Sequence, residues 1–249
     1  MNIEEYSRMF HLEENYWWFK GRREVVFRML QSQTAGHQGA PLRVFDLGCG
    51  TGKALMDLQA MGHQVTGLDF SGEALAFSHQ RGGQRLVRGD AASLPFADAS
   101  FDVIIALDIM EHVEDGASMA REMMRVLAPG GIAIINVPAH PFLWSGHDVA
   151  LHHFRRYTRR GFQSVLDAAQ FQLVRYSYSI CLLFFPALMY RLLYNLIGAI
   201  SRRPPQSHVI STGNLLNRLF FAIIALEARL MEYVNLPIGL SLLAVARKN

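Results

Sequence analysis

Short runs of apolar, β-branched residues recur along the first half of the chain, each followed by a turn or an amphipathic segment. These runs are typical of buried parallel strands, because they are continuously hydrophobic rather than alternating. Helical periodicity separates them over Lys53–Met61, Gly72–Gln80 and Gly116–Leu127. Strands that alternate with helices in this way predict a doubly wound α/β sheet with right-handed crossovers. The predicted strands are Leu42–Leu47, Gln64–Leu68, Val103–Leu107 and Ile132–Val137, with Leu86–Arg88 as a shorter candidate.

After Val137 the regular alternation gives way to a different pattern. Thr158 is a suitable N-cap for a helix over Arg159–Ala169. Phe171–Ser179 alternates between apolar and polar residues, which indicates a strand, and Ser241–Arg247 is a further strand candidate. An insertion separates these two strands. The division that follows is a helical N-terminal cover (1–35), one α/β domain (36–185 and 237–249) and the insertion (186–236).

The composition supports a large folded domain and places the net charge in one region. The chain has 249 residues, of which 51% are hydrophobic and 18% charged, so we expect a well-buried core. The formal net charge is +3, and residues 186–236 hold five arginines against two glutamates. The remainder has 19 basic and 19 acidic residues and is neutral. We expect no nucleic-acid partner, because such binding depends on neutralising phosphates.

The cysteines and the first residues of the sequence bear on the compartment. Cys49 and Cys181 fall in a glycine loop and at a strand end, where disulfides are not expected. The segment MNIEEYSRMF is acidic and lacks the apolar core of a signal peptide. We therefore expect a reduced chain in the cytoplasm.

The sequence VFDLGCGTG (Val44–Gly52) places glycines directly after the first strand. Glycines at positions 48, 50 and 52 let the backbone turn tightly and approach a ligand closely. The dinucleotide fingerprint G-x-G-x-x-G is not met, because position 53 is lysine. Asp46 would repel a pyrophosphate, whereas it could pair with an ammonium group. The loop therefore favours a ligand other than a dinucleotide.

Acidic residues stand at two more strand ends. Asp69 ends the second strand, where a carboxylate can accept hydrogen bonds from both ribose hydroxyls. Asp90 follows the third strand and could accept one from an adenine amino group. In open α/β sheets ligands bind at the carboxyl ends of the strands, so these acids and the glycine loop would share one site.

From Val44 to Val137 this ordered set resembles the class I S-adenosylmethionine-dependent methyltransferases (methyltransferase type 11/12-like). The resemblance implies a Rossmann-like sheet, mostly parallel, with an antiparallel last strand that Ser241–Arg247 would provide. It implies S-adenosyl-L-methionine as the cofactor; the alternative is a Rossmann-like protein without it. The cofactor-binding residues that it implies are Asp46, Gly48, Cys49, Gly50, Asp69, Phe70, Asp90, Ala91 and Leu107.

Glu111 and His112 follow the fourth strand in FDVIIALDIMEHV, and His153 lies in a later histidine-rich loop. Methylation of an oxygen requires that its proton be removed, and a histidine suits that task. We therefore predict Glu111, His112 and His153 as catalytic residues. The alternative is that Glu111 only favours the N-terminus of a helix.

The spacing D-x-x-E-H (Asp108, Glu111, His112) resembles the metal site of small-RNA 2′-O-methyltransferases and, more loosely, that of quinone-biosynthesis O-methyltransferases. Carboxylates and imidazoles suit Mg²⁺ or Mn²⁺. The first acid is an aspartate here, one methylene shorter than glutamate, and the histidine that would complete the site is undefined. Polar loop residues without a metal are the preferred interpretation.

Aromatic residues and histidines outside the cofactor motifs are candidates for binding the acceptor. Trp17 and Trp18 precede an amphipathic segment, which in the family commonly forms a helix over the cofactor. His147, His152 and Tyr157 lie in the loop after the fifth strand, where we expect the acceptor to enter. The alternatives are that the tryptophans only pack this helix and that the arginine-rich HHFRRYTRR segment is a solvated helix start.

The insertion has two apolar helix candidates, Ala187–Ile200 and Asn214–Val234. Ile180–Ile200 is long enough to span a bilayer, but Arg191 and Asn195 lie inside it and disfavour spanning. The two helices with their positive charge suggest peripheral contact with the inner face of the membrane or a lid over a lipophilic acceptor. The alternative is a homodimer interface through residues 186–236.

These patterns predict an S-adenosylmethionine-dependent methyltransferase that acts on a small hydrophobic or lipid-like acceptor, at oxygen. One alternative is C-methylation of an isoprenoid- or polyketide-like acceptor, which needs no strong base. Another is a non-catalytic subunit that binds S-adenosylmethionine and docks a partner.

Overall fold

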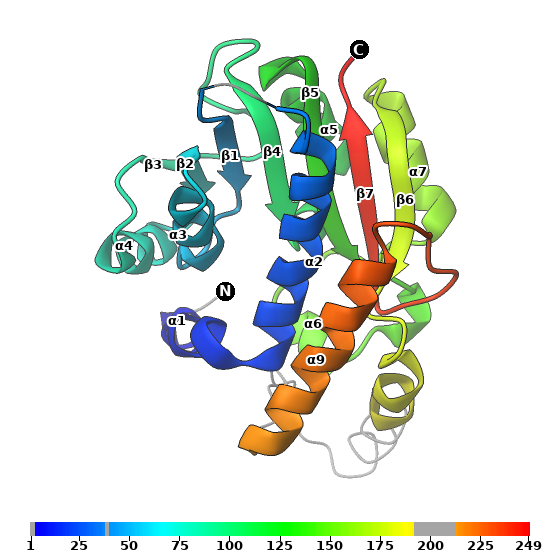
Figure 1. The fold of residues 1–249 in the computed structure, drawn as a ribbon. Helices are drawn as coiled ribbons and strands as arrows, with labels where there is room; N and C mark the ends of the chain where they lie inside the picture. The colour runs from blue at the N-terminus through cyan, green and yellow to red at the C-terminus, as the bar shows by residue number, and fades with distance from the viewer. Residues whose placement is uncertain (1–2, 38–39, 192–212) are drawn as a thin grey trace.

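The computed structural model describes residues 3–37, 40–191 and 213–249 (Figure 1). Within these residues a seven-stranded sheet has the order β3-β2-β1-β4-β5-β7-β6. The strands are β1 (Arg43–Leu47), β2 (Gln64–Asp69), β3 (Leu86–Arg88), β4 (Phe101–Leu107), β5 (Leu127–Pro138), β6 (Gln172–Ser179) and β7 (Ser241–Arg247).

Strands β1 to β5 pair in parallel, so their carboxyl ends meet at the same edge of the sheet. Strand β7 runs antiparallel to both of its neighbours, with Ala244 opposite Ile135 of β5 and Tyr176 of β6. This arrangement confirms the predicted fold class, including the antiparallel last strand.

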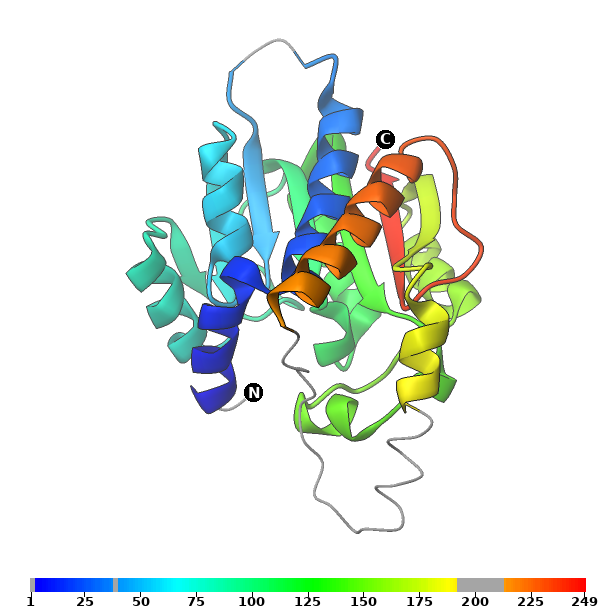
Figure 2. The ribbon, with the colours of Figure 1, turned by 60° about the horizontal axis from the view of Figure 1, so that its bottom comes forward.

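Helices cover both faces of the sheet (Figures 1 and 2). On one face α2 and α9 lie side by side, although their sequences are far apart, and on the other face α5 packs against α7. Residues 184–191 are also helical. The described helices are α1 (Ile3–Asn15), α2 (Trp17–Thr34), α3 (Lys53–Ala60), α4 (Gly72–Arg81), α5 (Gly116–Val126), α6 (Gly146–Ala150), α7 (Arg159–Ala168) and α9 (Asn214–Leu230), with short 3₁₀ turns η1 (Met110–His112) and η2 (Pro141–Leu143).

Polar side chains fix several helix starts. The Ser71 hydroxyl accepts from the N–H of Ala74 at the start of α4, and Thr158 accepts from Gly161 at the start of α7. The predicted N-cap of Thr158 is thereby confirmed. Each such cap satisfies one of the N–H groups that a helix end leaves without a partner, and is worth about 1 kcal/mol.

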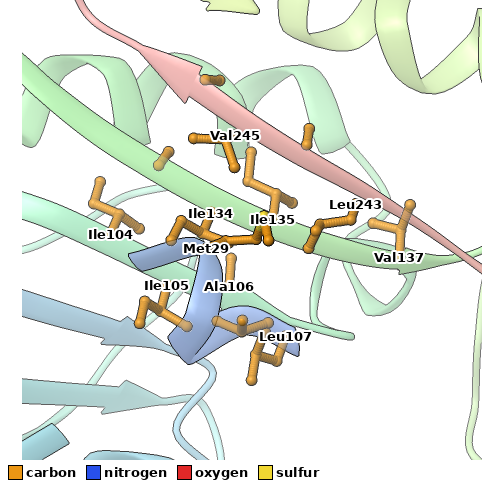
Figure 3. Packing of buried hydrophobic residues seen from close by; sticks show 14 of the residues in the cluster. Met29, Ile104, Ile105, Ala106, Leu107, Ile134, Ile135, Val137, Leu243 and Val245 are labelled. Atoms are coloured by element: carbon orange, nitrogen blue, oxygen red, sulfur yellow. The ribbon is translucent and has the colours of Figure 1, made fainter. Parts of the chain in front are cut away.

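The core lies between the central strands and the helices. Met29 of α2 lies against β4 and β5, close to Ile105 and Ile134 (Figure 3). These three side chains are fully buried, and each such burial contributes roughly 1.5–3 kcal/mol. Because β4 and β5 are covered on both faces, their side chains are apolar in succession, which is the pattern that the sequence shows.

The boundaries of some elements differ from the prediction. Strand β4 begins at Phe101, and β5 begins at Leu127, because Phe101 and Leu127 pair across an irregularity before the regular ladder. Trp17 lies in the first turn of α2 instead of preceding it. The second part of the predicted helix Ala187–Ile200 lies outside the described residues. Among the helices that can be assessed, none is both long enough and apolar enough to cross a bilayer.

Candidate active site

A large cavity opens at the edge where the parallel strands end. Its volume is about 1000 Å³, at the upper end of the roughly 300–1,000 Å³ of small-molecule sites. Its walls come from the ends of β1, β2 and β4, from α1 and α2, from the loop after β5 and from helical residues 184–191. A cavity of this size has room for a cofactor beside a second small molecule.

The loop between β1 and α3 brings bare backbone to the cavity. Gly48 has a φ of +75°, and a Cβ there would lie 2.8 Å from the side chain of Ile109. Its N–H donates to the carbonyl of Leu68 at 2.8 Å, which holds the loop against the end of β2. A side chain at position 48 would therefore displace the loop or Ile109.

Asp46 lies behind this loop, and one of its two carboxylate oxygens, Oδ2, lacks a hydrogen-bond partner among the described residues. The residue is 2% exposed. Burial raises the pKa of Asp46 to about 7, and the carboxylates of Glu13 and Asp69 add to this effect. A buried carboxylate of this kind is stabilised by a cation, so the site fits a ligand that carries an ammonium group.

Asp69 and Asp90 also line the cavity, at the ends of β2 and β3. Asp69 accepts from the N–H of Gly50 at 3.0 Å and of Ser71 at 2.9 Å, one bond to each carboxylate oxygen. Each oxygen has a further lone pair for a ligand hydroxyl. The cavity is also lined by the other predicted cofactor residues, namely Gly48, Cys49, Gly50, Phe70, Ala91 and Leu107.

A partly buried ion pair joins α2 to the end of β4. Arg22 donates to Asp108, which also accepts from the side-chain amide of Asn136 at 2.6 Å. Asp108 has a φ of +51°, an uncommon conformation that these two partners hold in place. The side chains that could hold a metal ion among the described residues are Glu111, His112 and His153, and Asp108 is not one of this group.

Glu111, His112 and His153 meet beside the end of β4, where one ligand atom of each lies within 4.8 Å of the others. Glu111 is fully buried, and neither of its carboxyl oxygens has a hydrogen-bond partner in the described part of the chain. Burial raises the pKa of Glu111 well above its usual range, and Asp108 adds to this. Burial, followed by the neighbouring His153, lowers the pKa of His112 to about 4. His112 is therefore neutral near pH 7.

A buried carboxylate distinguishes His153 from His112. Oδ1 of Asp148 lies 3.0 Å from Nδ1 of His153 and accepts from Nε of Arg156 at 2.8 Å. Burial alone would raise the pKa of Asp148, but His153 and Arg156 outweigh burial and hold it below its usual range. Because an ionised carboxylate only accepts, Nδ1 of His153 carries a proton in this contact. Asp148 thus fixes the orientation of the His153 ring and the nitrogen that faces the carboxylate.

Four of the five residues predicted for the acceptor line the same cavity: Trp17, Trp18, His147 and His152. The two tryptophans come from the first turn of α2, whereas His147 lies in α6 and His152 just after it. Burial, followed by the charge of Arg191, lowers the pKa of His147 to about 3, so this ring is neutral. The cofactor and acceptor candidates therefore meet in one space.

Tyr157 does not line the cavity, contrary to the prediction. Its backbone pairs with Ala139, which extends the pairing beyond the end of β5. The ring is buried beside Phe162, and its hydroxyl donates to the carbonyl of Met110 at 3.2 Å. Tyr157 thus packs the loop onto the core.

Charged residues that were not predicted for the site also line the cavity, among them Glu13, Arg156 and Arg191. Glu13 of α1 accepts from the hydroxyl of Thr51 and from Arg81, which closes α1 over the glycine loop. One feature of the sequence could have indicated a role for Arg191: a single arginine in an apolar stretch needs a polar partner inside the fold.

Comparison with known proteins points to one family. Residues 45–135 match the model of a family described as a methyltransferase domain. A protein of Mycolicibacterium smegmatis named a probable S-adenosylmethionine-dependent methyltransferase is 32% identical over 163 residues, which are 64% of this chain and 61% of that protein. The chain thus spans about three fifths of the length of this relative.

Solved structures share the fold at lower identity. An S-adenosylmethionine-dependent methyltransferase from Mesorhizobium loti has a TM-score of 0.56 and 18% identity, covering 89% of this chain and 98% of its own. The [4+2]-cyclase SpnF has a TM-score of 0.54 and 22% identity, covering 89% of this chain and 80% of its own. At these identities the likeness bears on the fold alone, and one fold can serve different reactions.

Proposed function

We propose that the chain, whose residues 45–135 match the methyltransferase-domain family, transfers a methyl group from S-adenosylmethionine to an oxygen of a small hydrophobic acceptor. The observation that carries the choice of oxygen is the pairing of Asp148 with His153, which lines the cavity. A hydroxyl has to lose its proton on methylation, whereas an attacking carbon needs no strong base.

The cofactor fits the polar groups at one end of the cavity. The ammonium group of its methionine part would supply the charge that buried Asp46 lacks. Asp69 would accept from the ribose hydroxyls, Asp90 with Ala91 would contact the adenine, and Leu107 would line the methionine part. When bound, S-adenosylmethionine supplies a methyl group on a sulfonium, which leaves as a neutral thioether.

His153 would remove the proton of the acceptor. Nε2 of His153 would take the proton of the acceptor hydroxyl, and the oxygen would accept the methyl group that S-adenosylmethionine supplies. Asp148 would stabilise the imidazolium, because its carboxylate lies 3.0 Å from Nδ1. Burial lowers the pKa of His112 to about 4, which makes this ring a weak base.

Apolar side chains favour a hydrophobic acceptor. Trp17 and Trp18 line the cavity together with Ala187 and Leu240, and these groups would exclude water and orient the acceptor. Ala187 belongs to residues 184–191, at the start of the predicted insertion. The insertion would therefore be a wall of the acceptor site.

A divalent cation is a second candidate for activating the acceptor oxygen at the same place. The specific observation is the buried carboxyl of Glu111, whose two oxygens lack partners, beside His112 and His153. Two imidazoles and one carboxylate suit a transition metal such as Mn²⁺ better than Mg²⁺. These three residues would hold the ion, which would supply a Lewis acid for the acceptor hydroxyl.

The test offers the protein S-adenosylmethionine with a deuterated methyl group and a panel of long-chain phenols and alcohols, and detects labelled products by mass spectrometry. We expect label on oxygen with the wild type. His153→Gln should reduce turnover by about 10²–10⁴-fold while calorimetry shows unchanged affinity for S-adenosylhomocysteine. His63→Gln, at a position before β2 and outside the cavity lining, is the matched control and should behave as wild type.

Two results would contradict the proposal at different levels. Full turnover by His153→Gln would remove the base and favour methylation at carbon. Failure of the folded wild-type protein to bind S-adenosylhomocysteine would contradict methyl transfer itself and favour another role for the fold.

A further inference from the structure

Two arginines approach Asp148 from different parts of the chain. Arg156, in the loop before α7, donates from Nε to Oδ1 of Asp148 at 2.8 Å. Arg191, in helical residues 184–191, places Nη1 3.6 Å from Oδ2 of the same carboxylate and donates to the carbonyl of Leu143 at 2.7 Å. Both arginines line the cavity. The wall near His153 thus holds two guanidinium groups around one carboxylate.

The positive charge of this cluster exceeds its negative charge. Asp148 is fully buried, its Oδ1 is shared by His153 and Arg156, and its Oδ2 accepts from the N–H of Ser145 at 3.0 Å. Arg191 is therefore left outside hydrogen-bond distance of the carboxylate. The side chains of Arg156 and Arg191 are only 4% and 22% exposed, so water screens their charges incompletely.

The titratable neighbours do not supply the missing negative charge. Burial lowers the pKa of His147 to about 3, so this imidazole carries no charge. Burial, followed by repulsion from Arg156, lowers the pKa of Arg191 to about 10, as expected for a guanidinium without full compensation.

We propose that Arg156 and Arg191 bind an anionic group of the acceptor, either a carboxylate or a phosphate monoester. This inference rests on the proposed function and narrows the acceptor to an amphiphilic acid whose hydroxyl is methylated. Guanidinium groups match the two oxygens of such anions with parallel hydrogen bonds. Because Asp148 contacts both Arg156 and His153, an anion held by the arginines would also fix the acceptor relative to the base.

The segment that carries Arg191 is anchored, which makes this position suitable for recognition. Glu227 of α9 is buried and accepts from the N–H of Cys181 at 2.7 Å and of Leu182 at 3.0 Å, just before helical residues 184–191. Arg191 itself is fixed to Leu143 in the loop after β5. The insertion thus contributes a charged side chain to the acceptor site in addition to an apolar wall.

The test measures binding to wild-type protein saturated with S-adenosylhomocysteine, using decanoate, decyl phosphate and the neutral decanamide. Calorimetry should show that decanoate or decyl phosphate binds about 10-fold or more tightly than decanamide, because a hydrogen bond between charged groups adds at least that much. The stronger of the two anions identifies the class of acid. Arg191→Gln should remove the preference, whereas Arg121→Gln, at an exposed position of α5, should keep it.

Equal binding of decanamide and both anions by the wild type would overturn the proposal, and so would a full preference retained by Arg191→Gln. Arg191→Lys preserves the positive charge but not the planar guanidinium, so this variant should keep part of the preference for anions. If Arg191→Lys still binds S-adenosylhomocysteine but shows no preference for anions, a charge-based site is contradicted. None of these measurements involves methyl transfer. A result that contradicts the anion site therefore leaves the proposed methyl transfer untouched, and a missing methyl transfer does not affect the binding test.

Discussion

The backbone N–H of Trp17 donates to the side-chain oxygen of Asn217 at 2.8 Å, although the two residues are 200 positions apart. The amide of Asn217 donates in turn to the carbonyl of Asn15 at 2.7 Å. The ring of Trp17 also packs against Phe220, with 5.2 Å between the ring centroids. A single side chain of α9 therefore satisfies backbone groups at the junction of α1 and α2, where helix ends leave them without helical partners.

Replacing this side chain should loosen the cover of the cavity. Asn217→Ala removes both hydrogen bonds, so we expect the free energy of unfolding in urea to fall by about 1–2 kcal/mol. Because Trp17 lines the cavity, the binding of apolar acceptors should weaken more than that of S-adenosylhomocysteine. Asn214→Ala, at an exposed position of the same helix, is the control. Unchanged stability of Asn217→Ala would show that the junction needs no such support.

Much of the sheet could be predicted from the sequence, because its central strands are covered on both faces. Burial of successive residues such as Ile104 and Ile105 makes the strand apolar throughout, and this pattern is visible without a structure. The positions of Asp46, Asp69 and Asp90 followed from the strand ends. Their place at one edge is a consequence of parallel pairing, so the cofactor end of the cavity was accessible to sequence reasoning.

The acceptor end was less accessible, since it depends on contacts between distant segments. Asp108 is engaged by Arg22 of α2, a pairing that no local spacing indicates. Tyr157 faces the core because its backbone extends the pairing of β5. Arg191 reaches Asp148 only through the packing of the insertion. In each case the partner is more than 15 residues away, where periodicity carries no information.

Asp46→Asn should stabilise the protein without cofactor. Burial raises the pKa of Asp46 from 3.8 to about 7, so the folded state binds an extra proton between these values. Stability therefore falls as the pH rises through this window, and the ionised carboxylate costs folding free energy above it. At about pH 8 the asparagine variant should be more stable in urea, by on the order of a few kcal/mol. Equal stability of the two proteins would contradict an uncompensated charge.

The same substitution should weaken cofactor binding and remove its pH dependence. In the wild type, a proton on Asp46 competes with the ammonium group, so affinity for S-adenosylhomocysteine should fall as the pH drops below about 7. The expected slope is about tenfold per pH unit. Calorimetry over this range checks it, and an unchanged slope in Asp46→Asn would assign the proton to another group.

Asp148→Asn tests the positioning of His153. The amide keeps the shape of the side chain but removes the charge that stabilises the imidazolium, so kcat should fall by about 10²–10⁴-fold. KM for an acidic acceptor should not rise, because Arg156 and Arg191 lose a competing carboxylate. A rise in KM with kcat unchanged would instead make Asp148 a structural residue. Affinity for S-adenosylhomocysteine checks that the cavity stays intact.

Removal of metal ions separates the two ways of activating the acceptor. If His153 acts as a base, dialysis against a chelator should leave methyl transfer unchanged. Loss of activity that Mn²⁺ restores would make Glu111, His112 and His153 ligands, as their mutual distances allow. In that case Glu111→Gln should reduce the activity that Mn²⁺ restores, because it removes one ligand. The variant should still bind S-adenosylhomocysteine.

We predict that the outer face of α9 contacts a lipid surface. Leu215, Leu219, Leu226 and Leu230 follow one side of the helix at helical spacing and are 81%, 50%, 63% and 50% exposed. The opposite side is already packed against the core through buried residues such as Ile224. An exposed apolar stripe on a helix of the region that holds the positive excess would suit an anionic membrane surface.

Leu219→Glu combined with Leu226→Glu should abolish this contact. Burial of a leucine contributes roughly 1.5–3 kcal/mol, so losing two should reduce binding to vesicles of phosphatidylcholine and phosphatidylglycerol by well over tenfold in a flotation assay. Val174→Glu, on β6 and 43% exposed, is the matched control and should float with the vesicles. A wild-type chain that sediments as a dimer and stays out of the vesicle fraction would contradict lipid contact. In that event the double variant should be a monomer, because the same leucines would form the interface between two copies.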